Sequence, residues 1–415
     1  MTETSKDFKD IFTPLKNSAS SYVQNLRQQA FAQLQNLDLP TTKHEEWKYT
    51  SLKNLAKESF ALAQPTDLNP KDFFVNNLEN FYKIVFVNGF LQENQTLLPS
   101  QVEFLSFQEA EKQGKLDNLL GSIAKTENDY FNAINTAFCD KGFYLRIPKN
   151  TKIDKPIVVY HIISGGFAFL QRNIVLAETG CQASLINLYL ADSNVFSSFT
   201  SEISEIFISE NAHLDCYKIQ NEKNQNYRID TTQVEQKSYS KFAMTTISLN
   251  GGLIRNNLNI LIEGEYCETY MNGLSYVKGK THMDHHTLAD HRKPNSYSNE
   301  LYKGLYDENS TGVFNGKIYV RQNAQKTNAY QQNRNVLLSE KASVYTKPQL
   351  EIWADDVKCS HGATTGKLDE TALFYMRARG ISEAEARKLL LKAFANEVIE
   401  KIEVEELKEY VENLI

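Results

Sequence analysis

The sequence predicts a mainly β protein whose core is a parallel β-helix, with a mixed α/β N-terminal region before it and helices after it. From about Gly142 to Trp353, short alternating runs of Ile, Val, Leu, Tyr and Phe are broken by polar residues, with almost no helical periodicity. One local pattern recurs along this stretch: two or three apolar positions, a polar kink and another short strand. Recurrence of one strand unit indicates a repeat fold.

The spacing of this pattern sets the size of the predicted repeat. The kink residues that we take as equivalent are Glu178, Glu210, Gln236, Gly264 and Glu340. The intervals between them are 32, 26, 28 and 76 residues. The last interval is close to three periods of about 25 residues, the range of β-helix coils. A single coil buries only one apolar stripe, so coils must stack, and some two hundred residues make about eight of them.

An antiparallel β-sandwich is the competing prediction for the same residues. A sandwich normally shows more hairpin turns of the Asn-Gly or Asp-Gly type. Gly251-Gly252 and Asn272-Gly273 fit that picture, but most breaks in the strand region do not. The pattern therefore favours the β-helix, and we place its core at residues 141–362.

Residues 1–140 form the predicted mixed N-terminal region. Apolar residues fall at helical spacing over 8–15 and 22–34. Thr41 or Thr42 is a candidate N-cap for another helix, with Glu45 completing a capping box after Thr42. We expect a strand at 82–90 that ends in an Asn-Gly turn, and helices at 105–120 and 124–138. These elements carry little chemical signature.

Residues 363–415 form the predicted C-terminal helical domain. A first helix over about 368–379 ends at Gly380, which suits the left-handed position after a helix. Ser382 and Glu385 form a capping box that starts a second helix. A third, short helix is expected over 404–415. Such a tail either caps the open end of the strand body or docks a partner.

Composition and charge exclude several classes of function. The chain has 415 residues and a formal net charge of −6, without a Lys/Arg cluster interleaved with aromatic residues, so nothing favours nucleic acid as a ligand. The N-terminal sequence lacks the apolar core of a signal peptide, and the apolar run over 157–170 is too short to span a bilayer. The five cysteines are scattered, as reduced intracellular thiols are. We expect a cytoplasmic protein without a membrane or nucleic-acid partner.

Two stretches resemble known site motifs but depart from them. Residues 273–281 are similar to a phosphate-binding P-loop, yet five residues separate the glycines instead of four, and no helix is expected to follow. Residues 282–286, HMDHH, have the histidine spacing of a zinc protease, but Met283 replaces the general-base Glu. In a strand, positions i and i+4 also lie about 13 Å apart. His285 and His291 could meet across a bend, but exposed or turn histidines are the simpler interpretation.

Paired carboxylates suggest an alternative function. Asp355 and Asp356 could act as acid and base in a stand-alone β-helix enzyme acting on a polysaccharide. Enzymes of this kind use a pair of carboxyl groups for these two roles. The expected cytoplasmic location makes this the minority hypothesis.

Cys359 and His361 are the stronger candidates for chemistry. In an extended segment, residues i and i+2 point to the same side, so thiolate and imidazole can approach one ion together. This pair of ligands suits iron, an iron–sulfur cluster or copper. Two ligands are too few for a closed site, so further ligands must come from elsewhere in the chain or from another chain.

A resemblance to a known family rests on these same residues. Residues 354–381, ADDVKCSHGATTGKLDETALFYMRARGI, resemble the C-terminal signature of the SufB/SufD family, the scaffold subunits of the SUF iron–sulfur cluster assembly machinery. The resemblance extends upstream and covers about residues 280–400. Within the family, Cys359-Ser-His361-Gly-Ala-Thr resembles the SufD branch, because the SufB counterpart lacks this cysteine.

The resemblance implies a fold, partners and site residues. It implies a right-handed parallel β-helix that pairs with a SufB-like subunit, and C-terminal helices that hold a SufC-like ATPase. A nascent iron–sulfur cluster is then expected at the SufB interface, with His361 as a key group and Cys359 beside it. Arg379, flanked by Phe374 and Ile381, is expected to contact the ATPase. The chain itself would be a non-catalytic scaffold that binds no nucleotide, and in isolation it could homodimerise.

Overall fold

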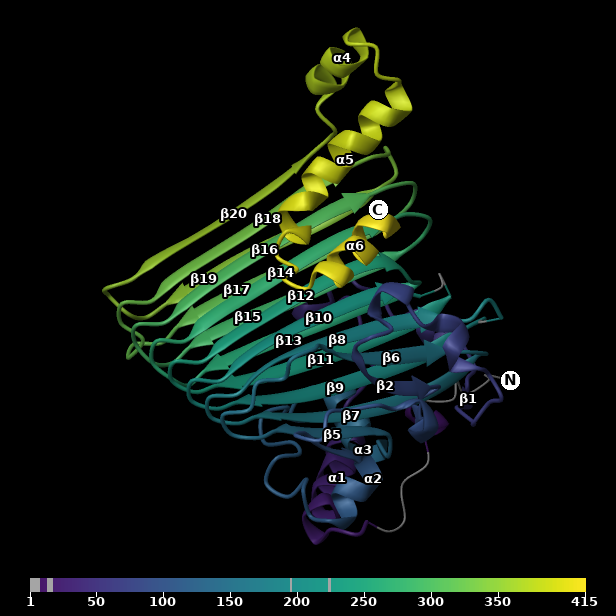
Figure 1. Ribbon diagram of the computed structural model, residues 1–415, viewed down its shortest axis with the longest axis vertical. Coiled ribbons are helices and arrows are strands. Elements are labelled where there is room, and N and C mark those ends of the chain that lie inside the picture. The colour runs from purple at the N-terminus through teal and green to yellow at the C-terminus, as the bar shows by residue number, and fades with distance from the viewer. Residues whose placement is uncertain (1–7, 13–17, 195, 223–224) are drawn as a thin grey trace.

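The computed structural model describes residues 8–12, 18–194, 196–222 and 225–415. Its core is a β-solenoid of about 8 turns, built from two parallel sheets that face each other (Figure 1). From β5 onward, successive strands of the chain alternate between the two sheets, so each turn contributes one strand to each. The predicted mainly β class and β-helix core are confirmed, and the antiparallel sandwich is wrong.

Within the described residues, each sheet has ten strands. Sheet A consists of β4 (Glu103–Ser106), β5 (Gly142–Ile147), β7 (Phe167–Ala177), β9 (Ser198–Ile208), β11 (Asn226–Gln236), β13 (Leu253–Ile262), β15 (His282–His291), β17 (Thr311–Val320) and β19 (Ser343–Ile352), with β1 (Ala61–Leu62) beside β7. Sheet B consists of β3 (Phe90–Leu91), β2 (Tyr82–Val87), β6 (Ile157–Ile163), β8 (Gln182–Ala191), β10 (His213–Asn221), β12 (Lys241–Asn250), β14 (Glu268–Val277), β16 (Tyr297–Tyr306), β18 (Asn328–Leu337) and β20 (Lys358–Gly366).

The strand register corrects the predicted repeat. The repeat ranges from 26 residues, between the paired Tyr227 and Leu253, to 32 residues, between the paired Thr311 and Ser343. Glu178 does follow a sheet A strand, but Glu340 lies in the turn between β18 and β19, at the opposite edge of the coil. The residues equivalent to Glu178 in the next three coils are Ser209, Lys237 and Glu263, each one residue away from the predicted kink. The backbone N–H of each donates to the carbonyl of the last residue of the sheet A strand in the preceding coil. Turns vary in length, so residue type alone does not align them.

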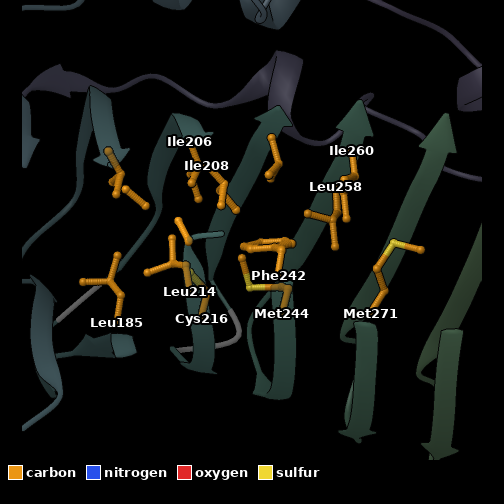
Figure 2. Close-up of a cluster of buried hydrophobic side chains, with 14 of the residues drawn as sticks. Leu185, Ile206, Ile208, Leu214, Cys216, Phe242, Met244, Leu258, Ile260 and Met271 are labelled. Atoms are coloured by element: carbon orange, nitrogen blue, oxygen red, sulfur yellow. The ribbon is translucent and has the colours of Figure 1, made fainter. Parts of the chain in front are cut away.

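The hydrophobic core lies between the two sheets. Alternate residues of each strand point inward, and parallel register stacks them into columns that run from coil to coil. One column of sheet B contains Leu185, Cys216, Met244 and Met271, which pack against Ile206 and other sheet A residues (Figure 2). Burying one such side chain contributes about 1.5–3 kcal/mol relative to leaving it exposed. The column therefore holds successive coils in register.

Helices of the N-terminal region cover the outer face of sheet A. Helices α1 (Ser21–Leu34) and α3 (Tyr130–Phe138) pack on Leu170 and Phe199, while α2 (Phe107–Lys112) packs near Tyr144. Short 3-10 turns lie at Phe8–Ile11, Glu45–Trp47, Leu55–Lys57, Pro70–Phe73, Asn76–Leu78 and Glu93–Gln95. Part of the predicted helix over 8–15, residues 13–15, falls outside the described residues.

Several predicted N-terminal helices are absent or shorter than expected. The capping box at Thr42 starts no α-helix: Glu45–Trp47 is a 3-10 turn, in which Glu45 pairs with Lys347 and Glu46 with Lys317 of sheet A. A hydrogen bond from His286 and the adjacent Lys317 lower the pKa of Glu46 to about 2. The helix predicted over 124–138 begins only at Tyr130, because Asn128 has a φ of +63° and Asp129 caps the helix by accepting the N–H of Asn132. The helix predicted over 105–120 ends at Lys112.

The C-terminal helices are α4 (Glu370–Ala378), α5 (Glu383–Ile399) and α6 (Glu405–Leu414). Ser382 caps α5 by accepting the N–H of Glu385, and Gly380 has a φ of +87°, as the sequence predicts. Helices α5 and α6 lie across the outer face of sheet B, and α4 projects beyond the last coil (Figure 1). In the described part of the chain, no helix is long and apolar enough to cross a membrane.

Candidate functional site

Strand β20 forms the end of sheet B and carries the two candidate ligands. It pairs in parallel with β18 on one side, and its other edge is open. Strand β19 ends sheet A in the same way, so the last coil presents two long strands with unpaired edges. Open strand edges are ready templates for another chain.

Cys359 and His361 lie on the inward-facing side of β20. Cys359 pairs with Ala329 and His361 with Gln331, and both partners are buried in the solenoid interior. Cys359 is half-buried against the core, and this burial raises the pKa of its thiol. His361 is exposed, because no further coil covers it. The two side chains share one face, as predicted, but the imidazole is the more accessible ligand.

A polar column lies directly beneath His361. The inward column that is apolar at Met271 continues in Glu300 and Gln331 before it reaches His361. The side-chain amide of Gln331 donates to the Glu300 carboxylate at 2.7 Å, and burial raises the pKa of Glu300 to about 7. Sequence reasoning missed both residues, since only the coil register shows that positions 300, 331 and 361 are neighbours.

Large apolar side chains surround the open end. Tyr345, Ile352 and Trp353 of the last coil are exposed, Trp353 by 48% of its surface. Trp353 packs edge-to-face on Tyr319, and the Arg321 guanidinium lies 5.0 Å from its ring centre. Exposed aromatic and aliphatic side chains with an arginine among them are the composition of a protein interface.

A second exposed patch, the α4 patch, consists of Phe374, Tyr375, Arg379 and Ile381. Phe374 is 72% exposed and Tyr375 60% exposed, while Leu373 anchors the helix from its inner side. Arg379 donates to the Tyr375 hydroxyl at 2.6 Å and Ile381 is half-buried. The predicted residues Phe374, Arg379 and Ile381 thus lie close together along the chain, with Tyr375 as an additional member.

The histidines over 282–291 are not exposed turn residues, as the sequence suggested, but lie in strand β15 and are largely buried. His282 and His286 lie on the outer face of sheet A around the buried Asp284, which also binds Arg255. His285 and His291 face inward and bond to Ser275 and Ser298 respectively, so they do not form a common site. Burial lowers the pKa of each of these two rings to about 4, which keeps both neutral at pH 7.

The described residues form neither a complete metal site nor a phosphate-binding loop. Across the described ranges, no three His, Cys, Asp or Glu side chains gather in a way that could hold a metal ion. The P-loop-like stretch runs from β14 through a turn directly into β15, so it meets no helix N-terminus. Asp355 and Asp356 lie in the exposed turn between β19 and β20. Cys359 and His361 are thus two candidate ligands on one face of β20, and the described residues place no third candidate ligand beside them.

Comparison with known proteins gives the same family for the whole chain. Residues 161–394 match the family described as "SUF system FeS cluster assembly, SufBD core domain", and residues 3–159 match "SufBD protein N-terminal region". The chain is 33% identical to an iron–sulfur cluster assembly SufBD family protein of Synechocystis, over 95% of this chain and 90% of that protein. It is 30% identical to the iron–sulfur cluster assembly protein SufD of Escherichia coli, over 92% of this chain and 90% of that protein. It is 25% identical to SufD of Bacillus subtilis, over 96% and 94% respectively. This protein therefore belongs to the SufBD family of iron–sulfur cluster assembly proteins.

Proposed function

We propose that this chain is a SufD-type scaffold subunit, and that a nascent iron–sulfur cluster forms where its last coil meets a SufB-like subunit. The observation that carries the proposal is the exposed His361 on the open edge strand β20, with the half-buried Cys359 on the same face. The cluster is the cargo of this site. His361 supplies one nitrogen ligand to it, and the partner supplies the thiolate that this chain does not offer in exposed form.

The different readiness of the Cys359 thiol and the His361 imidazole to bind metal supports a site in which each subunit supplies a different ligand. A thiol is a metal ligand as the thiolate, and burial of Cys359 holds its pKa above the ordinary value of 9.0. The neutral imidazole of a histidine is a ligand without any such activation. His361 is therefore the principal ligand from this chain, and Cys359 contributes once the cluster approaches. The incomplete ligand set favours assembly between chains.

The second partner in this proposal is a SufC-like ATPase that binds the α4 patch. Support comes from the large exposed side chains of Phe374 and Tyr375 on a helix that projects beyond the solenoid (Figure 1). The nucleotide would be bound and hydrolysed by that partner, and this chain would act as a non-catalytic scaffold. The polysaccharide-enzyme alternative gains no support, because Asp355 and Asp356 lie in an exposed turn.

We further propose that the chain is cytoplasmic and that it can form a homodimer in isolation. The five cysteines are free thiols, which fits the reducing cytoplasm. In the absence of a SufB-like subunit, the same open coil of two copies could pair, which gives a homodimer in isolation. The free thiols support the cytoplasmic location, and the exposed last coil supports the homodimer. Binding of the SufB-like subunit to that coil would replace the homodimer.

The experiment that tests the site is His361→Ala in a complex reconstituted from the three subunits. We expect the complex to form normally, because His361 is exposed and its removal leaves no cavity. Cluster formation, followed as iron and acid-labile sulfide per complex, should fall by at least tenfold. Cys359→Ala should have a smaller effect. The exposed His44, in the N-terminal region, is the matched control for a lost imidazole. Normal cluster loading in His361→Ala would refute the role of this residue.

A further inference from the structure

The residue beneath His361 has an unused hydrogen-bond acceptor. Gln331 is 1% exposed, and its amide nitrogen is held by the Glu300 carboxylate at 2.7 Å. Its side-chain oxygen, Oε1, is buried and has no hydrogen-bond partner among the described residues. A buried acceptor without a partner costs about 1–3 kcal/mol. A donor that reaches this oxygen is therefore strongly favoured.

His361 is the donor that the coil register brings to this oxygen. His361 and Gln331 are paired across β18 and β20 and face the same side, so their Cα atoms lie about 4.8 Å apart. Gly316 on the opposite sheet leaves room for the Gln331 amide, because a Cβ at position 316 would collide with it. An exposed ring changes rotamer on the picosecond-to-nanosecond scale, so the imidazole can turn toward the coil interior.

We propose that Gln331 is a positioning residue for His361: its Oε1 accepts one ring N–H of the imidazole, while Glu300 holds the amide in the orientation that allows this bond. A glutamine amide has two possible orientations, and in this structure its NH₂ group donates to one Glu300 oxygen at 2.7 Å, as it can to a neutral or an ionised carboxyl group. This bond leaves Gln331 Oε1 as the amide atom that is free to accept from His361.

This hydrogen bond decides which ring nitrogen is free. In a neutral imidazole, the nitrogen that donates to Gln331 carries the proton, and the other nitrogen keeps its lone pair. The free nitrogen then points away from the coil, toward the open end. Partners of this kind orient metal-binding histidines and fix their tautomer, and their loss typically costs 10–100-fold in metal affinity or activity. The consequence for cluster assembly rests on the proposed function, whereas the hydrogen bond itself does not.

The test measures the tautomer of His361 directly. Imidazole ¹⁵N chemical shifts are recorded for the full, isolated chain with labelled histidine, with His361 assigned from its loss in His361→Ala. The wild type should show one dominant neutral tautomer. Gln331→Met, which has similar volume and no acceptor, should show a mixture of both. The same tautomer ratio in Gln331→Met and in the wild type would overturn the proposal, since it would mean that water satisfies Oε1.

A double variant that exchanges Glu300 and Gln331 tests whether the change in Gln331→Met comes from the lost acceptor or from disturbed packing. Glu300→Gln combined with Gln331→Glu keeps one amide and one carboxyl in the column and places an acceptor beneath His361. This variant should restore a single bonded ring nitrogen, and a mixture of tautomers in the folded swap variant would also contradict the proposal.

A second readout separates this inference from the proposed function. In the three-subunit complex, Gln331→Met should lower cluster loading by about tenfold. A changed tautomer with unchanged loading would uphold the positioning bond and contradict the role of His361 in assembly. An unchanged tautomer would contradict the positioning bond, whatever the loading.

Discussion

At the residue scale, one interior column of sheet B changes from apolar to polar as it approaches the open end of the solenoid. Met271, Glu300, Gln331 and His361 follow one another in a single column of sheet B. The two buried members are joined by a hydrogen bond, and Gln331 Oε1 remains without a partner among the described residues. A buried oxygen without a partner lowers the stability of this end of the solenoid, as is common at functional sites.

The first prediction concerns Glu300, whose pKa is raised from 4.5 to about 7 by burial. Between these pH values the unfolded chain releases the proton while the folded chain keeps it. The raised pKa of Glu300 therefore contributes its full stabilisation of the folded state below about pH 4.5. This contribution is lost as the pH rises through 7. The full loss corresponds to about 3 kcal/mol.

Glu300→Gln removes this titration, so its stability relative to the wild type should increase from pH 5 to pH 8. Thermal unfolding midpoints of both proteins over this range check the prediction. Substitution of the exposed Glu210 by Gln is the control and should leave the pH dependence as in the wild type. Parallel pH profiles for Glu300→Gln and the wild type would show that Glu300 is ionised in the folded protein throughout.

At the element scale, α5 fixes where the α4 patch lies. Val398 and Ile399 of α5 pack on the outer face of sheet B, and Glu397 binds Lys303 at 2.7 Å and Arg334 at 3.3 Å. Lys303 and Arg334 belong to β16 and β18, and β18 is the strand that pairs with β20. Helix α5, which follows the α4 patch in the chain, is thus held by the strands next to β20.

The α4 patch supports a prediction about ATPase binding. Phe374→Ser should weaken binding of the SufC-like ATPase by at least tenfold, because a large, exposed aromatic side chain is typical of a binding hot spot. The stability of the isolated chain should change little, since Phe374 is 72% exposed. Calorimetric titration measures the affinity. Leu97→Ser, another exposed apolar residue outside the C-terminal helices, is the matched control. Equal affinity for Phe374→Ser and the control would place the ATPase elsewhere.

At the scale of the whole molecule, the two ends of the solenoid differ. At the N-terminal end, the short strands β3 and β4 run antiparallel to their neighbours and end the parallel stacking. At the C-terminal end, β19 and β20 retain long open edges, with Tyr345, Ile352 and Trp353 exposed beside them. A long, exposed edge with apolar side chains is tolerated in a native protein when another chain covers it.

This asymmetry predicts which end binds the SufB-like subunit. Trp353→Glu should weaken that association by at least tenfold, because it places a charge in the apolar centre of the interface. The association constant is measured by sedimentation with the purified partner. Tyr239→Glu changes an equally exposed aromatic residue several coils away and should have no effect. Loss of association in both variants, or in neither, would contradict an interface at the last coil.

Much of this architecture can be predicted from sequence because the local signals and the final fold agree. The period-2 patterning predicts the strands, the recurrence of the strand unit predicts the solenoid, and Ser382 and Gly380 mark the ends of the C-terminal helices. The domain bounds 1–140, 141–362 and 363–415 remain predictions. The N-terminal helices were overestimated because apolar spacing does not show where the backbone leaves helical geometry: Asn128 is left-handed, and the helix starts only after its N-cap, Asp129.

The sequence by itself determined the fold class, the pair Cys359 and His361 on one side of a strand, and the family signature around them. Only the tertiary structure decided that Cys359 is half-buried while His361 is exposed, and that Gln331 and Glu300 lie beneath the imidazole. The physical reason is the stacking of coils: residues 30 or 31 positions apart become neighbours through the strand register. Turns of variable length set that register, so only the folded chain shows which residues form one column.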